Sequence, residues 1–151
     1  MSIFQRSIRI LPFLLLPFFI GISYAADEKA CPSGSIKITE ENKRFSVLVP
    51  KSSGLGSDQA YDDIGCAVLA RNEECAMRQG MFDSAALAYD YFTGAEFPAE
   101  KMYFVLKTDV KTPRGFGIVA FGDKAEAEKF SAAHGKGKVI KWFELVDEKI
   151  Q

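Results

Sequence analysis

The first 25 residues constrain the fold most, because they have the composition of a removable export signal and leave a shorter chain to fold. Two arginines give a positively charged start, and an apolar run follows at 10–20. Ser23-Tyr24-Ala25 then offers small residues of the kind that a signal peptidase reads. We therefore expect cleavage after Ala25 or Ala26, which leaves a single domain over residues 26–151.

The same segment predicts where the protein resides. The apolar run is shorter than the ~20 residues that a spanning helix needs, and it contains Pro12 and Pro17. The residues before Cys31, Glu28-Lys29-Ala30, lack the apolar residue that a lipoprotein signal has three positions before its cysteine. We expect a periplasmic or secreted protein, soluble after cleavage, without a membrane span or a lipid anchor.

Charge limits the kind of partner. Removal of the leader takes away Arg6 and Arg9, so the formal charge changes from −1 to −3. A mildly acidic chain without a basic cluster argues against nucleic acid as the partner. A periplasmic protein is the expected partner.

Three cysteines, Cys31, Cys66 and Cys75, remain in the exported chain. An odd number in an oxidising compartment leaves at least one thiol unpaired or paired between molecules. We predict that Cys31 forms a disulfide with Cys66 or with Cys75. For Cys66 three interpretations stay open: a buried packing residue, a disulfide partner and a metal ligand.

Short apolar runs separated by glycine-rich turns predict strands, and two segments between them predict helices. The predicted strands cover residues 45–49, 86–92, 102–106, 117–121 and 138–142. The order predicts an α+β fold with two similar strand-helix-strand halves.

Capping residues predict where both helices begin. Asp62 or Asp63 is placed to cap a helix from Ile64, whose apolar period is interrupted by a polar cluster at 71–74. Asp123 and Glu126 form a cap-like pair for the second helix, which Gly135 ends. His134, at that helix end, is interpreted as a cation beside the negative end of the helix dipole.

The motifs occur in a characteristic order. They are Asp62-Asp63-Ile64-Gly65-Cys66, Asp90-Tyr91, Tyr103-Phe104-Val105, the run from Thr112 to Phe121 and the closing segment from Ala125 to Ile140. In this order they resemble the NosL-like family, the accessory proteins of nitrous oxide reductase maturation. The resemblance implies two small α/β halves, similar to part of the organomercurial lyase fold. It also implies an exported metallochaperone that binds copper(I) and hands it to the reductase.

The chain departs from the family pattern where the family has sulfur. The family's Cys-x-x-Cys-Gly-Met element is Cys31-Pro32-Ser33-Gly34-Ser35 here, and its Pro-Met-Gly element is Pro113-Arg114-Gly115. The methionine that commonly follows Gly-Cys is Ala67. Hydroxyl groups are hard, weak donors for copper(I), and a guanidinium group is no ligand.

The remaining sulfurs still predict a copper(I) site, with Cys31, Cys66 and Met77 as its ligands. On one continuous helix, Cys66 and Cys75 are about 900° apart and face opposite sides. Cys66 and Met77 share a face but lie ~16 Å apart along the helix, too far to bind the same ion. A site therefore requires that Cys31 from the N-terminal arm, or a methionine from a loop, folds against Cys66.

Two other functions stay open: a metal-free interaction module that has lost the site, and a thiol-dependent enzyme that uses Cys66. Catalysis is not the expected activity, since the chain has a single histidine and no phosphate-binding glycine loop.

Overall fold

The structure, a computed structural model, describes residues 31–32 and 36–150. The expected export signal and the two serines of the motif at Cys31 lie outside these residues. Among the described residues, no helix has the length and apolar character that crossing a membrane requires.

The first half builds a four-stranded antiparallel sheet with two helices. Its central strand β1 pairs with β2 on one side and β3 on the other, so that Leu48 faces both Ala60 and Leu87, and β4 extends the sheet beyond β3. The elements are β1 (Val47–Val49), β2 (Gln59–Tyr61), α1 (Ile64–Glu73), α2 (Ala76–Ala85), β3 (Leu87–Tyr89) and β4 (Glu96–Pro98).

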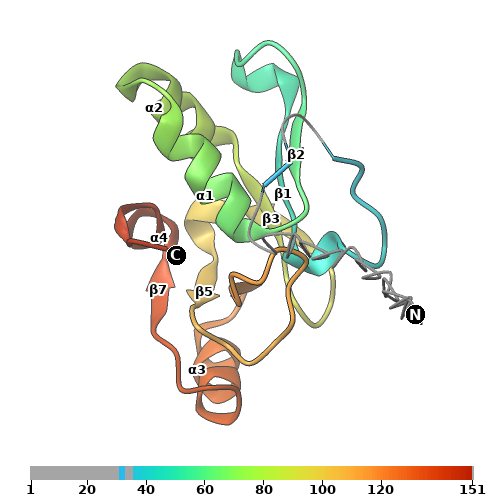
Figure 1. Cartoon of the computed structure of the whole chain (residues 1–151), viewed down its shortest axis with the longest axis vertical. Helices are drawn as coiled ribbons and strands as arrows, with labels where there is room; N and C mark the ends of the chain where they lie inside the picture. The colour runs from blue at the N-terminus through green and yellow to red at the C-terminus, as the bar shows by residue number, and fades with distance from the viewer. Residues whose placement is uncertain (1–30, 33–35, 151) are drawn as a thin grey trace, which may run out of the picture.

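The second half repeats this arrangement with a three-stranded sheet. Its central strand β5 pairs with β6 and β7, so that Phe104 faces both Ala120 and Ile140. The elements are β5 (Tyr103–Val105), β6 (Val119–Phe121), α3 (Lys124–Ala133), β7 (Val139–Lys141) and α4 (Trp142–Asp147). The predicted α+β fold with two similar strand-helix-strand halves is confirmed (Figure 1).

Short 3₁₀ turns complete the chain: η1 (Lys43–Phe45), η2 (Lys51–Ser53) and η3 (Ala99–Lys101).

Several elements differ from the sequence prediction. The interrupted period at 71–74 marks the end of one helix and the approach to a second, because Glu74 and Cys75 are extended between α1 and α2. The strand predicted over 86–92 ends at Tyr89, and β2 and β4 were not predicted. Trp142, predicted as the end of the last strand, is instead the first residue of α4.

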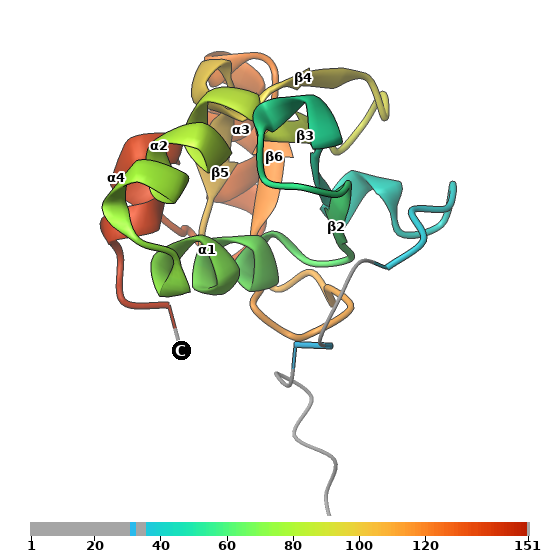
Figure 2. The same cartoon turned by 90° about the horizontal axis from the view of Figure 1, so that it is seen from above.

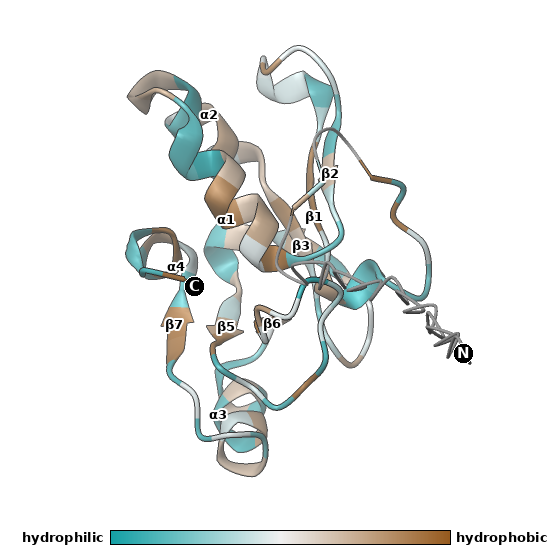
Figure 3. Cartoon of the chain, viewed as in Figure 1, coloured by the Kyte–Doolittle hydropathy of each residue, from teal (hydrophilic) through white to brown (hydrophobic). Residues whose placement is uncertain are grey.

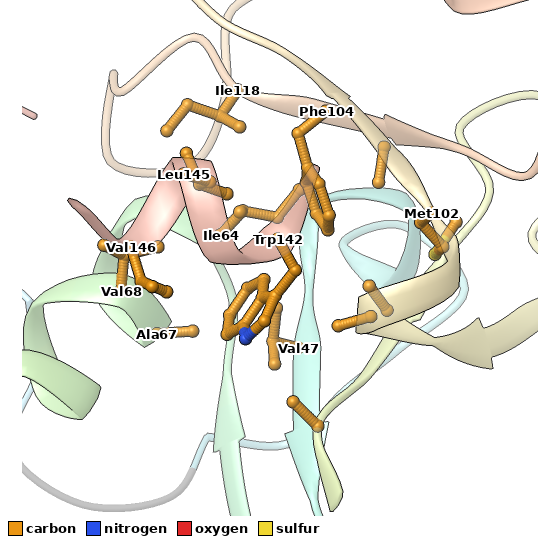
Figure 4. Close-up of a cluster of buried hydrophobic side chains, with 14 of the residues drawn as sticks. Val47, Ile64, Ala67, Val68, Met102, Phe104, Ile118, Trp142, Leu145 and Val146 are labelled. Atoms are coloured by element: carbon orange, nitrogen blue, oxygen red, sulfur yellow. The ribbon is translucent and has the colours of Figure 1, made fainter. Parts of the chain in front are cut away.

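One apolar core joins the two halves. Trp142 lies in its centre, with Val47 of β1, Ile64 of α1 and Phe104 of β5 around it (Figure 4). All four side chains are fully buried. α1 and β7 both contribute apolar residues to this core (Figure 3). A second cluster lies under α3 and is formed by Val105, Val119, Phe121, Ala127 and Phe130.

A buried carboxylate fixes the three helices around this core. Asp83 of α2 accepts two hydrogen bonds from Arg71 of α1, at 3.1 Å to Nε and 2.6 Å to Nη2. It also accepts one from the indole Nε1 of Trp142, at 2.8 Å. The buried indole N–H of Trp142 thus finds its acceptor in Asp83, which links the start of α4 to α2. The helix start itself is capped locally, since the Glu144 side chain accepts from Lys141 N at 2.9 Å.

Removal of this acceptor should be costly. Asp83→Ala leaves a nearly buried guanidinium and a buried indole N–H without their partner, and we expect the free energy of unfolding to fall by about 3–5 kcal/mol. Urea denaturation followed by tryptophan fluorescence measures it. Asp147→Ala, at an exposed position of α4, should change stability by less than about 0.5 kcal/mol. Equal effects of the two substitutions would contradict the role given to Asp83.

Candidate functional site

Two sequence motifs that lie far apart in the chain meet where α1 begins. The loop between β5 and β6 runs against the first turn of α1, beside the segment that carries Cys31 (Figure 2). Asp62-Asp63-Ile64-Gly65-Cys66 and Pro113-Arg114-Gly115 thus belong to one site, at the junction of the two halves.

Asp63 holds this junction together. It is the N-cap of α1 and accepts a hydrogen bond from Gly65 N at 2.9 Å, as the sequence predicted for one of the two acids. Its second oxygen accepts from Arg114 N at 2.9 Å, and Thr112 adds a side-chain hydrogen bond. Complete burial raises the pKa of Asp63 above its ordinary value, although these three hydrogen bonds oppose the shift.

Asp62, the other acid, is neutralised by Arg114. The guanidinium donates from Nη2 to Oδ2 at 2.7 Å and from Nε to Oδ1 at 3.3 Å. Asp62 is nearly buried, and Arg114 is about one-third exposed. Arg114, at the position where the family resemblance predicts a methionine, therefore forms a two-point ion pair with the motif it faces.

Two glycines allow close packing here, Gly65 between α1 and the loop and Gly117 within the loop itself. A Cβ on Gly65 would lie 2.1 Å from the ring of Phe116, so that only glycine lets this ring pack on α1. Gly117 has φ +63°, and a Cβ there would lie 2.9 Å from the carbonyl oxygen of Thr108.

The two candidate thiolates are joined in a disulfide. Cys31 and Cys66 are bonded with a Cα–Cα distance of 5.5 Å, and the bond ties the N-terminal arm to the first turn of α1. The predicted disulfide of Cys31 is thus confirmed, with Cys66 as the partner. Cys75 is a free, exposed thiol at the N-cap of α2. Reduction of the bond would leave two thiols close enough to contact one ion.

The third predicted ligand lies elsewhere. Met77 is in the first turn of α2 and 71% exposed, beyond the C-terminal end of α1. Cys66 lies in the first turn of α1, so at least ~10 Å of helix separates the two side chains. The structure does not bring them together.

His134 is the C-cap of α3, as predicted, where its ring stacks on Phe130 and its Nδ1 lies 2.9 Å from an Asp109 oxygen.

Within residues 31–32 and 36–150, no three His, Cys, Asp or Glu side chains gather in a way that would hold a metal ion.

Sequence reasoning missed two residues of the site, Thr112 and Phe116. Both belong to the motif that carried the family resemblance, so this motif could have marked them as site residues. Their contacts could not be predicted, because Phe116 meets Gly65 and Thr112 meets Asp63 only in the folded chain.

The geometry defines a class of protein: a small α+β domain of two similar halves, with a cysteine pair and a neutralised acid pair at their junction. Comparison with known proteins identifies the family. The NosL family model matches residues 69–150, more than half of the chain, and the chain therefore belongs to the NosL family. This family is linked to copper handling and is not a known enzyme family. Neither the curated proteins nor the solved structures include a match to this chain.

The matched range begins after Cys66. It includes α2, the loop with Arg114 and the whole second half, and it leaves out both bonded cysteines. Membership of the family thus rests on the matched scaffold, and the match carries no information about Cys31 and Cys66.

The fit between Gly65 and Phe116 can be tested with a double-mutant cycle. We expect Gly65→Ala to lower the free energy of unfolding by at least about 1–3 kcal/mol, because the added methyl overlaps the ring. In a Phe116→Ala background the same change should cost much less. Thermal or urea unfolding of the four proteins gives the coupling energy.

Gly80→Ala is the matched control. Gly80 is also inside a helix, but a Cβ there meets nothing within 4 Å. This substitution should stabilise the protein by about 0.5–1 kcal/mol through the higher helix propensity of alanine. An equal cost of Gly65→Ala with and without Phe116 would refute the packing argument.

Proposed function

We propose that this NosL-family protein is exported, binds copper(I) through reduced Cys31 and Cys66, and delivers the ion to a periplasmic metalloenzyme such as nitrous oxide reductase. Copper is the cargo of this reaction.

The observation that carries the proposal is the distance between the two cysteines. Their Cα atoms lie 5.5 Å apart although 35 positions separate them in sequence. Two thiolates at this separation can contact one copper(I) ion, and soft sulfur ligands select that ion over harder metals. The family's link to copper handling supports the same assignment.

The surroundings suit an anionic complex. Copper(I) with two thiolates keeps a net charge of −1, and Cys66 is in the first turn of α1, near the positive end of the helix dipole, which favours negative charge. The ion pair with Arg114 offsets the charge of Asp62 in the same region.

Exposure differs between the two ligands in a way that suits delivery. Cys66 is 2% exposed and Cys31 is exposed. The buried thiolate would retain the ion while a ligand of the receiving enzyme replaces the exposed one.

Met77, the third predicted ligand, joins this site only if α2 moves toward the start of α1. Met77→Leu keeps the size and removes the sulfur. We expect it to retain the copper(I) affinity, and a weaker affinity would add Met77 to the ligand set.

One observation favours a second function, a metal-free interaction module. Arg114 replaces a thioether and is fully engaged with Asp62. A chain that no longer binds copper would keep the family scaffold and use the junction surface to contact a protein partner.

Copper(I) titration separates these functions. The reduced mature protein, titrated against a competing copper(I) chelator, should bind one ion tightly, and Cys66→Ser and Cys31→Ser should each abolish this binding. Cys75→Ser, at an exposed thiol away from the pair, should bind as the wild type does. Absence of binding by the reduced wild type would leave the interaction module as the better explanation.

Arg114→Met tests whether the lost thioether matters. We expect the copper(I) affinity of the reduced protein to rise by about tenfold, because a soft donor then faces the start of α1. Stability should fall by about 1–3 kcal/mol as Asp62 loses its charged partner. Arg114→Leu is the control: it breaks the same ion pair without adding sulfur, so it should lower stability equally and leave the affinity unchanged. An equal rise in affinity for both variants would exclude ligation by the added methionine.

A further inference from the structure

The two sulfurs of the proposed copper site, those of Cys31 and Cys66, are bonded to each other. The Cys31–Cys66 disulfide joins the arm to the first turn of α1. A cysteine binds copper(I) as its thiolate, and a sulfur in a disulfide carries no such charge. The oxidised protein and the copper(I)-binding protein are therefore two different redox states of the same pair.

We propose that copper(I) loading requires prior reduction of this disulfide by a protein dithiol, which attacks the sulfur of Cys31. The inference rests on the proposed function, and it adds a partner of stated chemistry: a reductant with two neighbouring cysteines.

The direction of attack follows from exposure. A thiolate has to approach the sulfur that it attacks, and access decides which sulfur of an asymmetric disulfide reacts. Cys31 is exposed on the arm, whereas Cys66 is 2% exposed in α1. An incoming protein thiol therefore reaches Cys31 and not Cys66.

The leaving group is also favourable on this side. Attack at Cys31 releases Cys66 as a thiolate in the first turn of a ten-residue helix. The positive end of the helix dipole stabilises a negative sulfur released there, which makes Cys66 the better leaving group of the pair. Of the two acids beside it, Asp62 is paired with Arg114 and Asp63 is surrounded by hydrogen-bond donors.

The complete exchange transfers two electrons. The reductant's first thiolate forms a bond to Cys31 Sγ as the Cys31–Cys66 bond breaks and Cys66 leaves as a thiolate. The reductant's second thiol loses its proton and attacks the reductant's first sulfur, which is bonded to Cys31 in the mixed disulfide. That bond breaks, and Cys31 leaves as a thiolate. The reductant ends as a disulfide, and this protein ends with two thiolates that take up copper(I) or protons.

The scaffold can survive this step. Cys31 belongs to the arm, and the apolar core is built from Val47 onward. The first turn of α1 keeps its cap at Asp63 and its buried Ile64. Reduction thus breaks the covalent link, while Ile36, whose N–H donates to the carbonyl oxygen of Ala60 in β2 at 2.9 Å, keeps the segment that follows Cys31 against the sheet.

The first test compares the two redox states in the Cys75→Ser protein, which has no third thiol. The oxidised and the reduced forms are titrated with copper(I) against a chelator, with circular dichroism as a check of folding. We expect the reduced form to bind at least about 100-fold more tightly. Equal binding by both forms overturns the redox requirement and keeps copper binding. Absence of binding by both forms overturns the proposed function itself.

The second test locates the attacked sulfur. The oxidised Cys75→Ser protein is exposed briefly to glutathione, quenched with acid and analysed by peptide mass spectrometry. The adduct should lie on Cys31, with roughly tenfold or greater preference over Cys66. A reduced thioredoxin-like dithiol protein should then remove the disulfide completely, as free-thiol counting would report. Adducts mainly on Cys66, or a disulfide that resists the dithiol protein, would overturn the proposal.

Discussion

The carboxylate of Asp63 is the constraint on which the functional region depends. It is completely buried, and its donors come from both halves: Gly65 N in α1, and Arg114 N and Thr112 in the loop between β5 and β6. A buried charge is tolerated only when hydrogen bonds surround it, so the loop has to lie against the helix start for either segment to be stable. The two motifs, 51 residues apart at Asp63 and Arg114, are thereby held in one place. The packing of Phe116 on Gly65 then leaves the loop little freedom to shift.

This constraint gives the replacement of methionine by Arg114 a structural meaning. Its backbone N–H serves Asp63 whatever the side chain is, so the loop can keep its position through the change. The side chain is free to vary, and here it forms a two-point ion pair with the nearly buried Asp62. The Arg114 side chain thus supplies charge compensation at the junction, beside the bonded pair Cys31 and Cys66.

The features that local sequence could predict were those set by neighbouring residues. Caps at Asp63 and Asp123 located the starts of α1 and α3, and apolar runs located the central strands. The features that it missed depend on distant contacts. The buried position of Trp142 depends on the hydrogen bond from its indole N–H to Asp83, 59 residues away. β2 (Gln-Ala-Tyr) and β4 (Glu-Phe-Pro) contain no apolar run, and they are held as strands by pairing with β1 and β3. The pairing of Cys31 was predicted, but the choice between Cys66 and Cys75 needed the fold.

On the proposed function, a copper(I) site with only two sulfur ligands depends more strongly on the redox state of the protein than a site with three or four sulfur ligands. A site with additional thioether donors can retain some affinity for copper(I) when one thiolate is lost, because thioethers do not form disulfides. On the proposed function, oxidation of this chain removes both copper ligands at once, so the ligand set and the redox state change together. The asymmetry of the pair gives that coupling a direction, since the exposed Cys31 is open to exchange and the buried Cys66 is held by a capped helix. On the proposed function, the loss of the family's other sulfur ligands turns a metal site into one that binds copper only after another protein has reduced it.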